Sequence, residues 1–453
     1  MNSTLTILGS ITLILFQTVS GQQTVNPNAS PEARAVLNYL YEIGGKQTLS
    51  GNHNYNAHPD QYTKEVQQIT GKTPVIWGSD FAFRTNKDQN TRNRPGMIEE
   101  AEKQWNNGSI ITLMWHAVRP IDDDNEVAIW EKSIQGELTD EEWNEFLTPG
   151  TTLNKKWLGQ IDEIAEYLKI LRDKNIPVLW RPYHEMNGKW FWWGYKKGPE
   201  GFVKLWKSMY DRYTNYHHLD NLIWVWNSNA PRDRENDTAF AYSDFFPGLE
   251  YVDILAADVY HSDWKQSHHD DLKLLAGGKP ISLGECGELP TPEILEKQPY
   301  WTWFMCWANW VSRPEINSEE SVRNLYNFKQ VQTKENTTWM LPKRLAVVWT
   351  SGDPEVAEKM CFMYTHAAKR NNWFCDVRLI VWGPSAKLLT ENKALQAKVR
   401  DMQQSGIKVE ACIACANMYG IAEKLNKMDI DVKGMGDPLS KYLKEENTVV
   451  ITF

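Results

Sequence analysis

Residues 177–194 read Pro-Val-Leu-Trp-Arg-Pro-Tyr-His-Glu-Met-Asn-Gly-Lys-Trp-Phe-Trp-Trp-Gly, and the rest of the chain is best interpreted outward from them. The apolar beginning, Pro177 to Trp180, has the length and composition of a buried strand. We expect the strand to stop at Pro182, because proline ends regular hydrogen bonding. An imidazole and a carboxyl, from His184 and Glu185, follow at once. The stretch therefore predicts a buried strand that delivers polar groups at its carboxyl end.

Aromatic residues come next, with Trp190, Phe191, Trp192 and Trp193 almost uninterrupted. Flat rings can cover the apolar face of a pyranose, and a carboxylic acid can protonate a leaving oxygen. An aromatic run with so polar a beginning is therefore better explained by a sugar site than by an ordinary core.

Short apolar runs alternate with helical patterns from about residue 33 to residue 350. Eight such runs are candidate strands, which predicts a (β/α)₈ barrel with its active site at the carboxyl ends of the strands. The expected strands are Thr48–Asn52, Val75–Trp77, Ile110–Trp115, Val178–Trp180, Leu222–Trp226, Val252–Asp258, Ile281–Leu283 and Trp303–Trp307. The expected helices include Pro59–Thr70, Met97–Asn106, Leu158–Asp173, Gly201–Tyr213 and Ser321–Phe328.

Polar or aromatic residues follow nearly every one of these runs. One such residue alone is more simply read as part of a loop, but the same placement at almost every strand end favours an assembled site. The residues concerned are His53, Asn54, Tyr55, Ser79, Asp80, Phe81, His116, His184, Glu185, Asn227, Tyr260, His261, Glu285 and Trp310.

The character of the chain changes near Leu345. Residues 343–453 contain a second, shorter alternation of strands and helices, which predicts a small doubly wound α/β domain with a mostly parallel sheet. Only three of the 22 tryptophans lie beyond residue 340, which also marks a boundary. The expected elements are strands Leu345–Trp349, Val377–Trp382, Ile407–Ala411 and Val449–Phe453 and helices Pro354–Lys369, Ser385–Gln403 and Asn417–Asn426.

Two carboxyl groups are candidates for glycoside hydrolysis, which in a retaining enzyme needs a pair about 5 to 5.5 Å apart. Glu185 follows the fourth expected strand, and Glu285 follows the seventh, in a pattern that a glycine, Gly287, then ends. The carboxyl ends of barrel strands face one central pocket, so we expect these two residues to meet although one hundred positions separate them.

The stretch 180–194, together with 45–51, 77–80, Trp115-His116 and the strand ending at Glu285, resembles glycoside hydrolase family 26 over about residues 32–338. The resemblance implies a retaining (β/α)₈ enzyme whose commonest relatives are endo-β-1,4-mannanases, acting on mannan, glucomannan or galactomannan. It also implies that Glu185 is the acid/base and Glu285 the nucleophile. A buried setting beside a second carboxylate would raise the pKa of Glu185, as an acid requires.

Several residues are assigned supporting roles around this pair. Tyr260 is expected to hold the nucleophile by a hydrogen bond, and His116 and His184 to bind sugar hydroxyls or Glu185, with a purely structural His184 as the alternative. The remaining predicted substrate contacts are Trp190, Trp193, Trp307 and Asn227, with the tryptophan rings as sugar platforms.

Two alternatives stay open at this point. The same mechanism would serve a β-1,3-xylan or a mixed-linkage β-glucan, because discrimination between hydroxyl orientations depends on small displacements of loop residues. The chain would alternatively be a carbohydrate-binding protein that no longer catalyses. The presence of both glutamates argues against this second reading.

Charge and composition limit the other partners. A net charge of −9 and a pI near 5.7 argue against a nucleic-acid partner. The apolar stretch Leu5–Phe16 and the small residues after it predict a signal peptide over residues 1–21, hence a secreted or periplasmic protein with no membrane span after cleavage. The expected domains are then 22–340 and 343–453. We expect no cofactor and no metal, with the acidic run 122–124 read as solvated charge, and no particular oligomeric state.

The cysteines are divided between the two domains. Cys286 and Cys306 lie in the barrel, as free thiols or as a bridge. Cys412 and Cys415 flank the start of an expected helix, where a thiol pKa is depressed. With residues 348–353 and 434–437, this segment resembles the DsrE/DsrF-like family over 343–453, which implies persulfide or redox chemistry, by preference at Cys412. A structural disulfide or an inert pair is the alternative.

Overall fold

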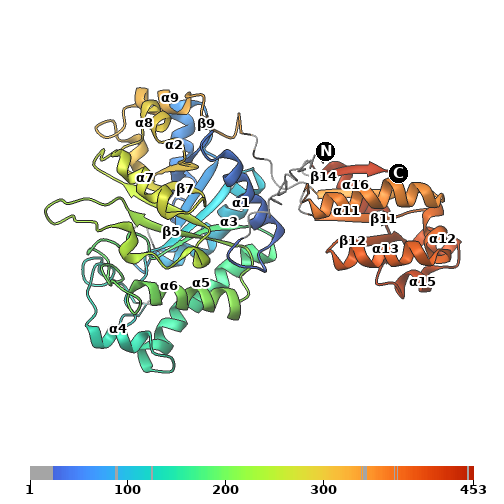
Figure 1. Cartoon of the computed structure of the whole chain (residues 1–453), viewed down its shortest axis with the longest axis horizontal. Helices are drawn as coiled ribbons and strands as arrows, with labels where there is room; N and C mark the ends of the chain where they lie inside the picture. Colours follow the sequence, from blue (N-terminus) through green and yellow to red (C-terminus); the bar gives the residue numbers. More distant parts are fainter. Residues whose placement is uncertain are drawn as a thin grey trace, which may run out of the picture.

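The structure is a computed structural model, and it describes residues 24–86, 90–123, 126–337, 339, 344–371, 373–374, 376–445 and 448–453. The predicted signal peptide, residues 1–21, lies outside the described residues, as do Asp124 and the junction 340–343. The described strands form two separate sheets (Figure 1), one of nine strands and one of five. The two-sheet arrangement agrees with the alternation read from the sequence.

The first sheet closes into a barrel, which confirms the predicted fold class. Its strands pair in parallel in the order β2-β3-β4-β5-β6-β7-β8-β1, and β1 also pairs with β2. A two-residue strand, β9 (Val331–Gln332), adds to β1 outside the ring. The eight barrel strands are β1 Thr48–His53, β2 Ile76–Asp80, β3 Ile110–Trp115, β4 Val178–Pro182, β5 Leu222–Asn229, β6 Ile254–Val259, β7 Ile281–Cys286 and β8 Trp303–Cys306.

Most barrel strands reach further toward their carboxyl ends than the apolar runs indicate. β4 does not end before Pro182, because Arg181 and Pro182 still pair with Met114 and Trp115 of β3. β7 likewise continues through Glu285 to Cys286, where it meets Cys306 of β8. In a closed barrel each strand has a neighbour on both sides, and the backbones of both neighbours can hydrogen-bond to it. A strand can therefore continue through residues with polar side chains. The candidate site is thus built partly on strands.

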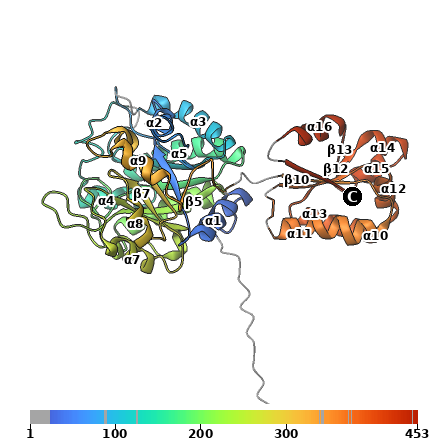
Figure 2. The same cartoon turned by 90° about the horizontal axis from the view of Figure 1, so that it is seen from above.

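Helices surround these strands (Figure 2), and most begin or end within a few residues of the predicted positions. A π-helical turn, Arg212–Tyr216, follows α6 where one longer helix was expected. The helices of this domain are α1 Pro31–Ile43, α2 Gln61–Thr70, α3 Arg94–Asn106, α4 Asp140–Phe146, α5 Thr152–Asp173, α6 Phe202–Asp211, α7 Gln266–Leu275, α8 Pro292–Lys297 and α9 Glu319–Tyr326.

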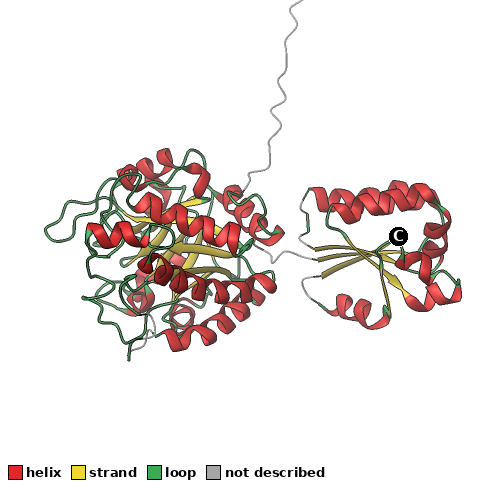
Figure 3. Cartoon of the chain, turned by 90° about the horizontal axis from the view of Figure 1, so that it is seen from below, coloured by secondary structure: helices red, strands yellow, loops and turns green. Residues whose placement is uncertain are grey.

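The second sheet is parallel throughout, in the order β13-β12-β11-β10-β14, and helices lie on both of its faces (Figure 3). This agrees with the predicted doubly wound α/β domain. Its strands are β10 Arg344–Trp349, β11 Asp376–Val381, β12 Lys408–Cys412, β13 Asp431–Lys433 and β14 Thr448–Thr452. Its helices are α10 Pro354–Val356, α11 Met363–Arg370, α12 Pro384–Glu391, α13 Lys393–Gln404, α14 Ile413–Met418, α15 Ala422–Asn426 and α16 Gly436–Lys444.

Several details of this domain differ from the sequence-based prediction, and one is a π-helical segment, Ala357–Phe362, within the helix expected over 354–369. The long helix expected over 385–403 is interrupted at Asn392, whose side chain caps α13 by accepting from the backbone N–H groups of Ala394 and Leu395. The helix expected over 417–426 is likewise two helices, α14 and α15. β13 and α16 were not predicted, because a three-residue strand and a helix begun by glycine carry little apolar periodicity.

Each domain has its own apolar core. The barrel core extends to Trp339, which packs against Tyr39 and Trp105 with ring centroids 5.2 and 6.2 Å away. The second domain has one cluster on each face of its sheet. Among the described helices, none has the length and apolar character needed to cross a bilayer.

Candidate active site

Glu185 lies just beyond β4 and is held on three sides. Its backbone N–H donates to the Asn227 carbonyl (2.8 Å), and its carboxylate accepts from Trp190 Nε1 (2.6 Å) and from Asn229 Nδ2. The side chain is nearly buried, at 9% exposure. Burial, followed by the charge of Glu285, raises the pKa of Glu185 to about 7. This carboxyl is therefore largely protonated in weakly acidic solution, as a proton donor must be.

Glu285 lies within β7 and has cationic and hydroxyl partners. Tyr260 donates its hydroxyl to Oε2 (3.0 Å), and Arg181 Nη2 donates to Oε1 (3.3 Å). His184 Nε2 is 4.0 Å from the same oxygen. Burial raises the pKa of Glu285, while Arg181, His116 and the Tyr260 hydroxyl oppose that rise. Of the two glutamates, Glu285 has the environment that favours the anion, as a nucleophile requires.

A buried chain of hydrogen bonds connects the two glutamates. Asn227 accepts from Arg181 Nη1 at Oδ1 (2.7 Å) and donates from Nδ2 to Asp258 (2.7 Å), while its carbonyl accepts from Glu185. Asn227 is fully buried, so its side chain does not reach a substrate, contrary to the assigned role. The structure instead makes it the link between Glu185 and the arginine that holds Glu285.

Asp258 is a third carboxyl of the site and was not recognised in the sequence. It lies opposite Glu285 in the β6–β7 pairing, at a register irregularity, and is fully buried. Burial and the charges of Glu285 and Glu185 raise its pKa well above the ordinary value. A sequence signal existed, since Asp258 stands two residues before Tyr260 at the end of an apolar run.

Three buried histidines, His53, His116 and His184, lie at or just beyond the carboxyl ends of β1, β3 and β4. His116 Nδ1 is 2.8 Å from Asp80 Oδ2, and although burial lowers the pKa of His116, this carboxylate outweighs it and raises the pKa. The His184 ring meets that of His116 edge-on at 4.8 Å, and burial keeps the pKa of His184 well below its usual value. Burial lowers the pKa of His53 to about 3. His116 is thus the imidazole of this group that favours a positive charge.

The aromatic residues after Glu185 divide into accessible and core positions. Trp190 is partly buried and bonds Glu185, and Trp307 is partly buried and stacks on His53 with centroids 4.1 Å apart. Trp193 is fully buried, stacks on Phe191 at 4.4 Å and donates Nε1 to the His184 carbonyl (2.7 Å). Trp193 therefore offers no face to a sugar and is a packing residue, which corrects its assignment as a platform.

The cysteines of the described chain are all free thiols. Cys286 and Cys306 are buried neighbours on β7 and β8 without a bridge, and Cys412 and Cys415 are not joined either. Cys412 is 6% exposed and Cys415 more so. Burial and the adjacent Cys412 thiol raise the pKa of Cys415, so the depressed pKa expected at this helix start is not found there.

One of the acidic residues predicted to be solvated, Asp122, has a guanidinium and a hydroxyl as partners. Asp122 is bonded by Arg119 (2.9 Å) and Ser133 (2.6 Å). In the ranges that the structure describes, no three His, Cys, Asp or Glu side chains are grouped as ligands of an ion.

Curated relatives share the barrel part of the chain. The mannan endo-1,4-beta-mannosidase of Thermothelomyces thermophilus is 34% identical over 315 residues, which cover 68% of this chain and 62% of that protein. The Bacillus subtilis (strain 168) enzyme of the same name is 29% identical and covers 62% and 81%. The chain spans about half of the length of two further relatives from Piromyces, 49% and 52%.

Two similar solved structures are likewise named as GH26 proteins. GH26A from Muricauda sp. MAR_2010_75 is 47% identical, with a TM-score of 0.66, and the match covers 69% of this chain and 99% of that one. The Podospora anserina GH26-CBM35 beta-(1,4)-mannanase is 32% identical with a TM-score of 0.59, covering 70% and 69%. Residues 343–453 match the DsrE/DsrF-like family, and residues 25–336 match the glycosyl hydrolase family 26 model, so the chain belongs to glycosyl hydrolase family 26 and carries an additional DsrE/DsrF-like domain.

Proposed function

We propose that the barrel is a retaining, endo-acting glycoside hydrolase that cleaves β-1,4-mannosidic linkages in mannan, glucomannan or galactomannan. The observation that carries the proposal is the pair of buried carboxyls with different surroundings: Glu185 has a pKa of about 7, whereas Glu285 contacts Arg181 and Tyr260. Such a pair can supply one proton donor and one nucleophile at the same pH.

In the first half of the reaction, Glu185 donates its proton to the leaving glycosidic oxygen while Glu285 attacks the anomeric carbon. The bond to the leaving sugar breaks and an ester to Glu285 forms. Arg181 and Tyr260 hold the Glu285 carboxylate by its two oxygens, so it has little freedom to rotate before the attack. The Trp190 indole fixes Glu185 in the same way.

In the second half, Glu185 acts as a base. The esterified Glu285 no longer carries a charge, so the main carboxylate that raised the pKa of Glu185 is gone and this residue loses its proton more readily. Glu185 then takes a proton from a water molecule, whose oxygen attacks the anomeric carbon and releases Glu285. Two displacements at one carbon preserve its configuration.

The substrate is inferred from relatives that are named mannan endo-1,4-beta-mannosidases. A panel of purified polysaccharides tests the assignment, with the release of reducing ends as the readout. Hydrolysis of mannan or glucomannan in preference to the others supports it. Preferred hydrolysis of a β-1,3-xylan or mixed-linkage β-glucan would replace the substrate and keep the mechanism.

The catalytic roles are tested with Glu185→Ala and Glu285→Ala. We expect both variants to lose at least about a thousandfold in kcat on mannan, since each group serves in bond making or breaking. Glu185→Ala should retain faster turnover of an aryl mannoside whose leaving group needs no proton. Full mannan hydrolysis by both variants would refute the roles, and binding without turnover by the wild type would establish a non-catalytic binding protein.

For the second domain we propose a thiol site at Cys412 and Cys415. Cys415 is the more exposed of the two and contacts Cys412, so it should react first with an alkylating reagent. Mass spectrometry after labelling at neutral pH measures this, with the buried Cys361 as internal control. Equal labelling of all three, or labelling of none, would favour an interaction module instead.

We also propose that the protein is exported, to the outside of the cell or to the periplasm, with cleavage before Gln22. Leu5–Phe16 supports this through its length and apolar composition. The amino-terminal sequence of protein recovered from culture medium or periplasm is the test. A product that retains Met1 in the cytoplasm would contradict it.

A further inference from the structure

Three ionisable side chains form a cluster that the proposed function does not use. Arg232 belongs to the loop after β5 and is 8% exposed, and its guanidinium pairs with Asp237 of the same loop. Asp237 Oδ2 is also 3.0 Å from His261 Nε2, in the loop after β6. His261 directly follows Tyr260, the residue that bonds Glu285. The cluster therefore joins two loops at the carboxyl ends of the barrel strands.

Arg232 is held firmly on the side that faces Asp237. Its Nε donates to the carbonyl (3.1 Å) and to Oδ2 (2.9 Å) of Asp237, and its Nη2 donates to Oδ1 (2.5 Å). The backbones of Arg232 and Ala239 exchange two hydrogen bonds as well, of 3.0 and 2.9 Å. Paired bonds between a guanidinium and a carboxylate fix orientation as well as position. The remaining nitrogen, Nη1, is therefore presented in one direction.

That nitrogen faces the residues that hold Glu185. Arg232 Nη1 donates to Asn229 Oδ1, and Asn229 Nδ2 donates to one oxygen of the Glu185 carboxyl. The guanidinium carbon also lies 5.3 Å from the centroid of the Trp190 ring, whose Nε1 donates to the other oxygen (2.6 Å). A single side chain thus contacts two residues that donate to the Glu185 carboxyl.

The contact with Arg232 decides which way the Asn229 amide points. A guanidinium can only donate, so Asn229 must turn its oxygen toward Arg232 and its NH₂ group toward Glu185. With the amide reversed, its oxygen would face the Glu185 carboxyl and accept the proton that an acid must deliver. Arg232 therefore keeps this proton available for the leaving oxygen.

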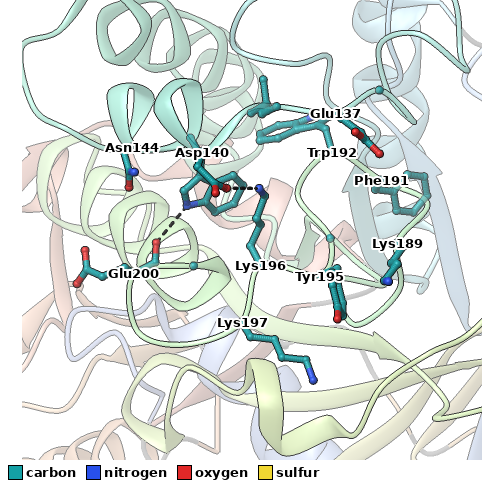
Figure 4. Close-up of a pocket in the computed structure, with 15 residues that line it drawn as sticks. Glu137, Asp140, Asn144, Lys189, Phe191, Trp192, Tyr195, Lys196, Lys197 and Glu200 are labelled. Atoms are coloured by element: carbon teal, nitrogen blue, oxygen red, sulfur yellow. Dashed lines mark hydrogen bonds and ion pairs between the residues drawn. The ribbon is translucent and has the colours of Figure 1, made fainter.

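Glu185 needs support of this kind because its backbone is strained. Its φ is 54°, in the left-handed region that is unfavourable for a residue with a side chain. The loop that carries Trp190 is anchored at its other end, where Lys196 pairs with Asp140 at 3.3 Å (Figure 4). Arg232 contacts the end of this loop that lies next to Glu185.

Charge gives Arg232 a second influence on Glu185. Titratable side chains from the carboxyl ends of β3, β6 and β7 interact with Glu185 as well, and Arg181 and His184 precede it in the chain. These further side chains are His116, Asp258, Tyr260 and Glu285. Burial and the charge of Glu285 raise the pKa of Glu185, and the charge of Arg232 is the strongest influence that lowers it.

We propose that Arg232 is a positioning residue for Glu185. It fixes the two groups that hold the Glu185 carboxyl, and Asp237 and His261 fix Arg232 in turn. The inference rests on the proposed function, which makes Glu185 the proton donor. Arg232 itself takes no part in making or breaking bonds.

The test compares Arg232→Met, which removes the charge but keeps a long side chain, with Arg232→Lys, which keeps the charge. Arg212→Met is the matched control, because Arg212 forms a similar cluster between α5 and the end of α6. Its Nε and Nη2 donate to Asp162 (2.9 and 2.6 Å), which also contacts His217 (2.7 Å). Kinetics on mannan are measured as a function of pH, and thermal melts check folding.

We expect Arg232→Met to lower kcat on mannan about 10- to 100-fold, with KM within about twofold of wild type. The alkaline limb of its kcat/KM profile should move up by at least about half a pH unit, because a cation near Glu185 is lost. Arg232→Lys should keep the limb within about 0.2 unit of wild type and recover part of kcat. Arg212→Met should melt at a lower temperature than wild type but keep its kcat and its limb.

A fall in kcat without a shift of the limb, or an equal shift in Arg232→Lys, would leave Arg232 a structural role only and overturn the proposal. If Arg232→Met does not fold, Arg232→Gln takes its place with the same expected result. If the wild type hydrolyses no polysaccharide, the proposed function fails. Titration of the Glu185 carboxyl by ¹³C NMR, assigned through Glu185→Gln, then still decides the proposal: the pKa should be higher in Arg232→Met than in wild type, and equal values would overturn it.

Discussion

At the scale of single residues, the site depends on two buried carboxyls. Their protein partners compensate to different extents for the water contacts that burial removes. Glu185 accepts from a neutral indole and an amide, whereas Glu285 has a guanidinium and a hydroxyl. The first arrangement leaves the cost of desolvation largely in place, and the second offsets it. Both glutamate side chains are buried, so burial alone does not distinguish them. The difference between their protonation states therefore follows from their hydrogen-bond partners.

The pKa of Glu185 predicts how activity depends on pH. Because the donor must be protonated and its pKa is about 7, we expect kcat/KM on mannan to fall as pH rises through about 7. Replacing Glu185 with Gln removes that titrating group. With an aryl mannoside that needs no protonation, the remaining activity of Glu185→Gln should show no decline near pH 7. A decline at the same pH in this variant would assign the alkaline limb to another residue.

The same shift makes a prediction about stability. A carboxyl whose folded pKa lies above its unfolded value of about 4.5 favours folding at low pH, and this contribution is lost as pH rises through about 7. Glu185→Gln should therefore be more stable than the wild type at pH 8 by about 1 to 3 kcal/mol, and near equal to it at pH 4. Denaturant melts at the two pH values measure the difference, and a gain that is the same at both would contradict the cause.

Asn227 makes a third prediction at this scale. Asn227→Ala leaves Arg181 Nη1 and Asp258 without their buried partner and frees Arg181 to move from Glu285. We expect a loss of about 2 to 4 kcal/mol of unfolding free energy and at least about a hundredfold loss in kcat. The exposed Asn215→Ala, on the surface after α6, serves as the control and should change neither. Wild-type kcat in Asn227→Ala would exclude Asn227 as the link between Glu185 and the arginine that holds Glu285.

At the scale of elements, β7 brings Glu285 into place only because the preceding residue, Gly284, has no side chain. A Cβ on Gly284 would lie 1.7 Å from Asn227 Oδ1 and 2.8 Å from Asp258 Oδ1. Because Gly284 has no side chain, Asn227 of β5 and Asp258 of β6 can lie close to β7. In this position Asn227 accepts a hydrogen bond from Arg181. The glycine is therefore required by neighbouring elements rather than by its own backbone angles.

Gly284→Ala should consequently damage the site from within the strand. We expect a loss of about 2 to 4 kcal/mol of stability, because backbone or Asn227 must move, together with a large loss in kcat. Gly159→Ala in α5 is the matched control, since nothing lies within 4 Å of its Cβ position, and it should be neutral or stabilising by about 1 kcal/mol. Thermal melts and mannan assays of both variants make the comparison.

At the scale of the whole molecule, the two domains have separate sheets and separate apolar cores. The residues around Glu185 and Glu285 all come from the barrel. The barrel core, however, includes Trp339, beyond the last barrel strand, through its contacts with Tyr39 and Trp105. The hydrolase part is thus expected to need the chain up to that tryptophan and nothing after it for activity.

Expression of residues 22–339 alone tests this expectation. We expect the kcat and KM of the full chain on mannan, within about twofold, and a single cooperative unfolding transition. A shorter piece ending at residue 333 loses the Trp339 contacts and should unfold several degrees lower. Inactivity of the longer piece, although folded by circular dichroism, would instead assign the second domain a part in hydrolysis.

The sequence by itself determined the alternation of strands and helices, the two domains and the two glutamates at strand ends. These features follow from local periodicity and from residues placed just after apolar runs, which nearest neighbours in the chain already encode. It also indicated Tyr260 beside Glu285, a contact that the structure contains at 3.0 Å.

Only the tertiary structure decided which of the polar and aromatic residues are available to a substrate. Trp193 and Asn227 look like ligand contacts in the sequence, yet one packs in the core and the other joins Arg181 to Asp258. The burial and the hydrogen-bond partners of these side chains depend on strands that are distant from one another in the chain. For β4, these strands are β5, β6 and β7. The stretch 177–194 therefore fixes where the site begins, and the closure of the barrel fixes what each of its side chains does.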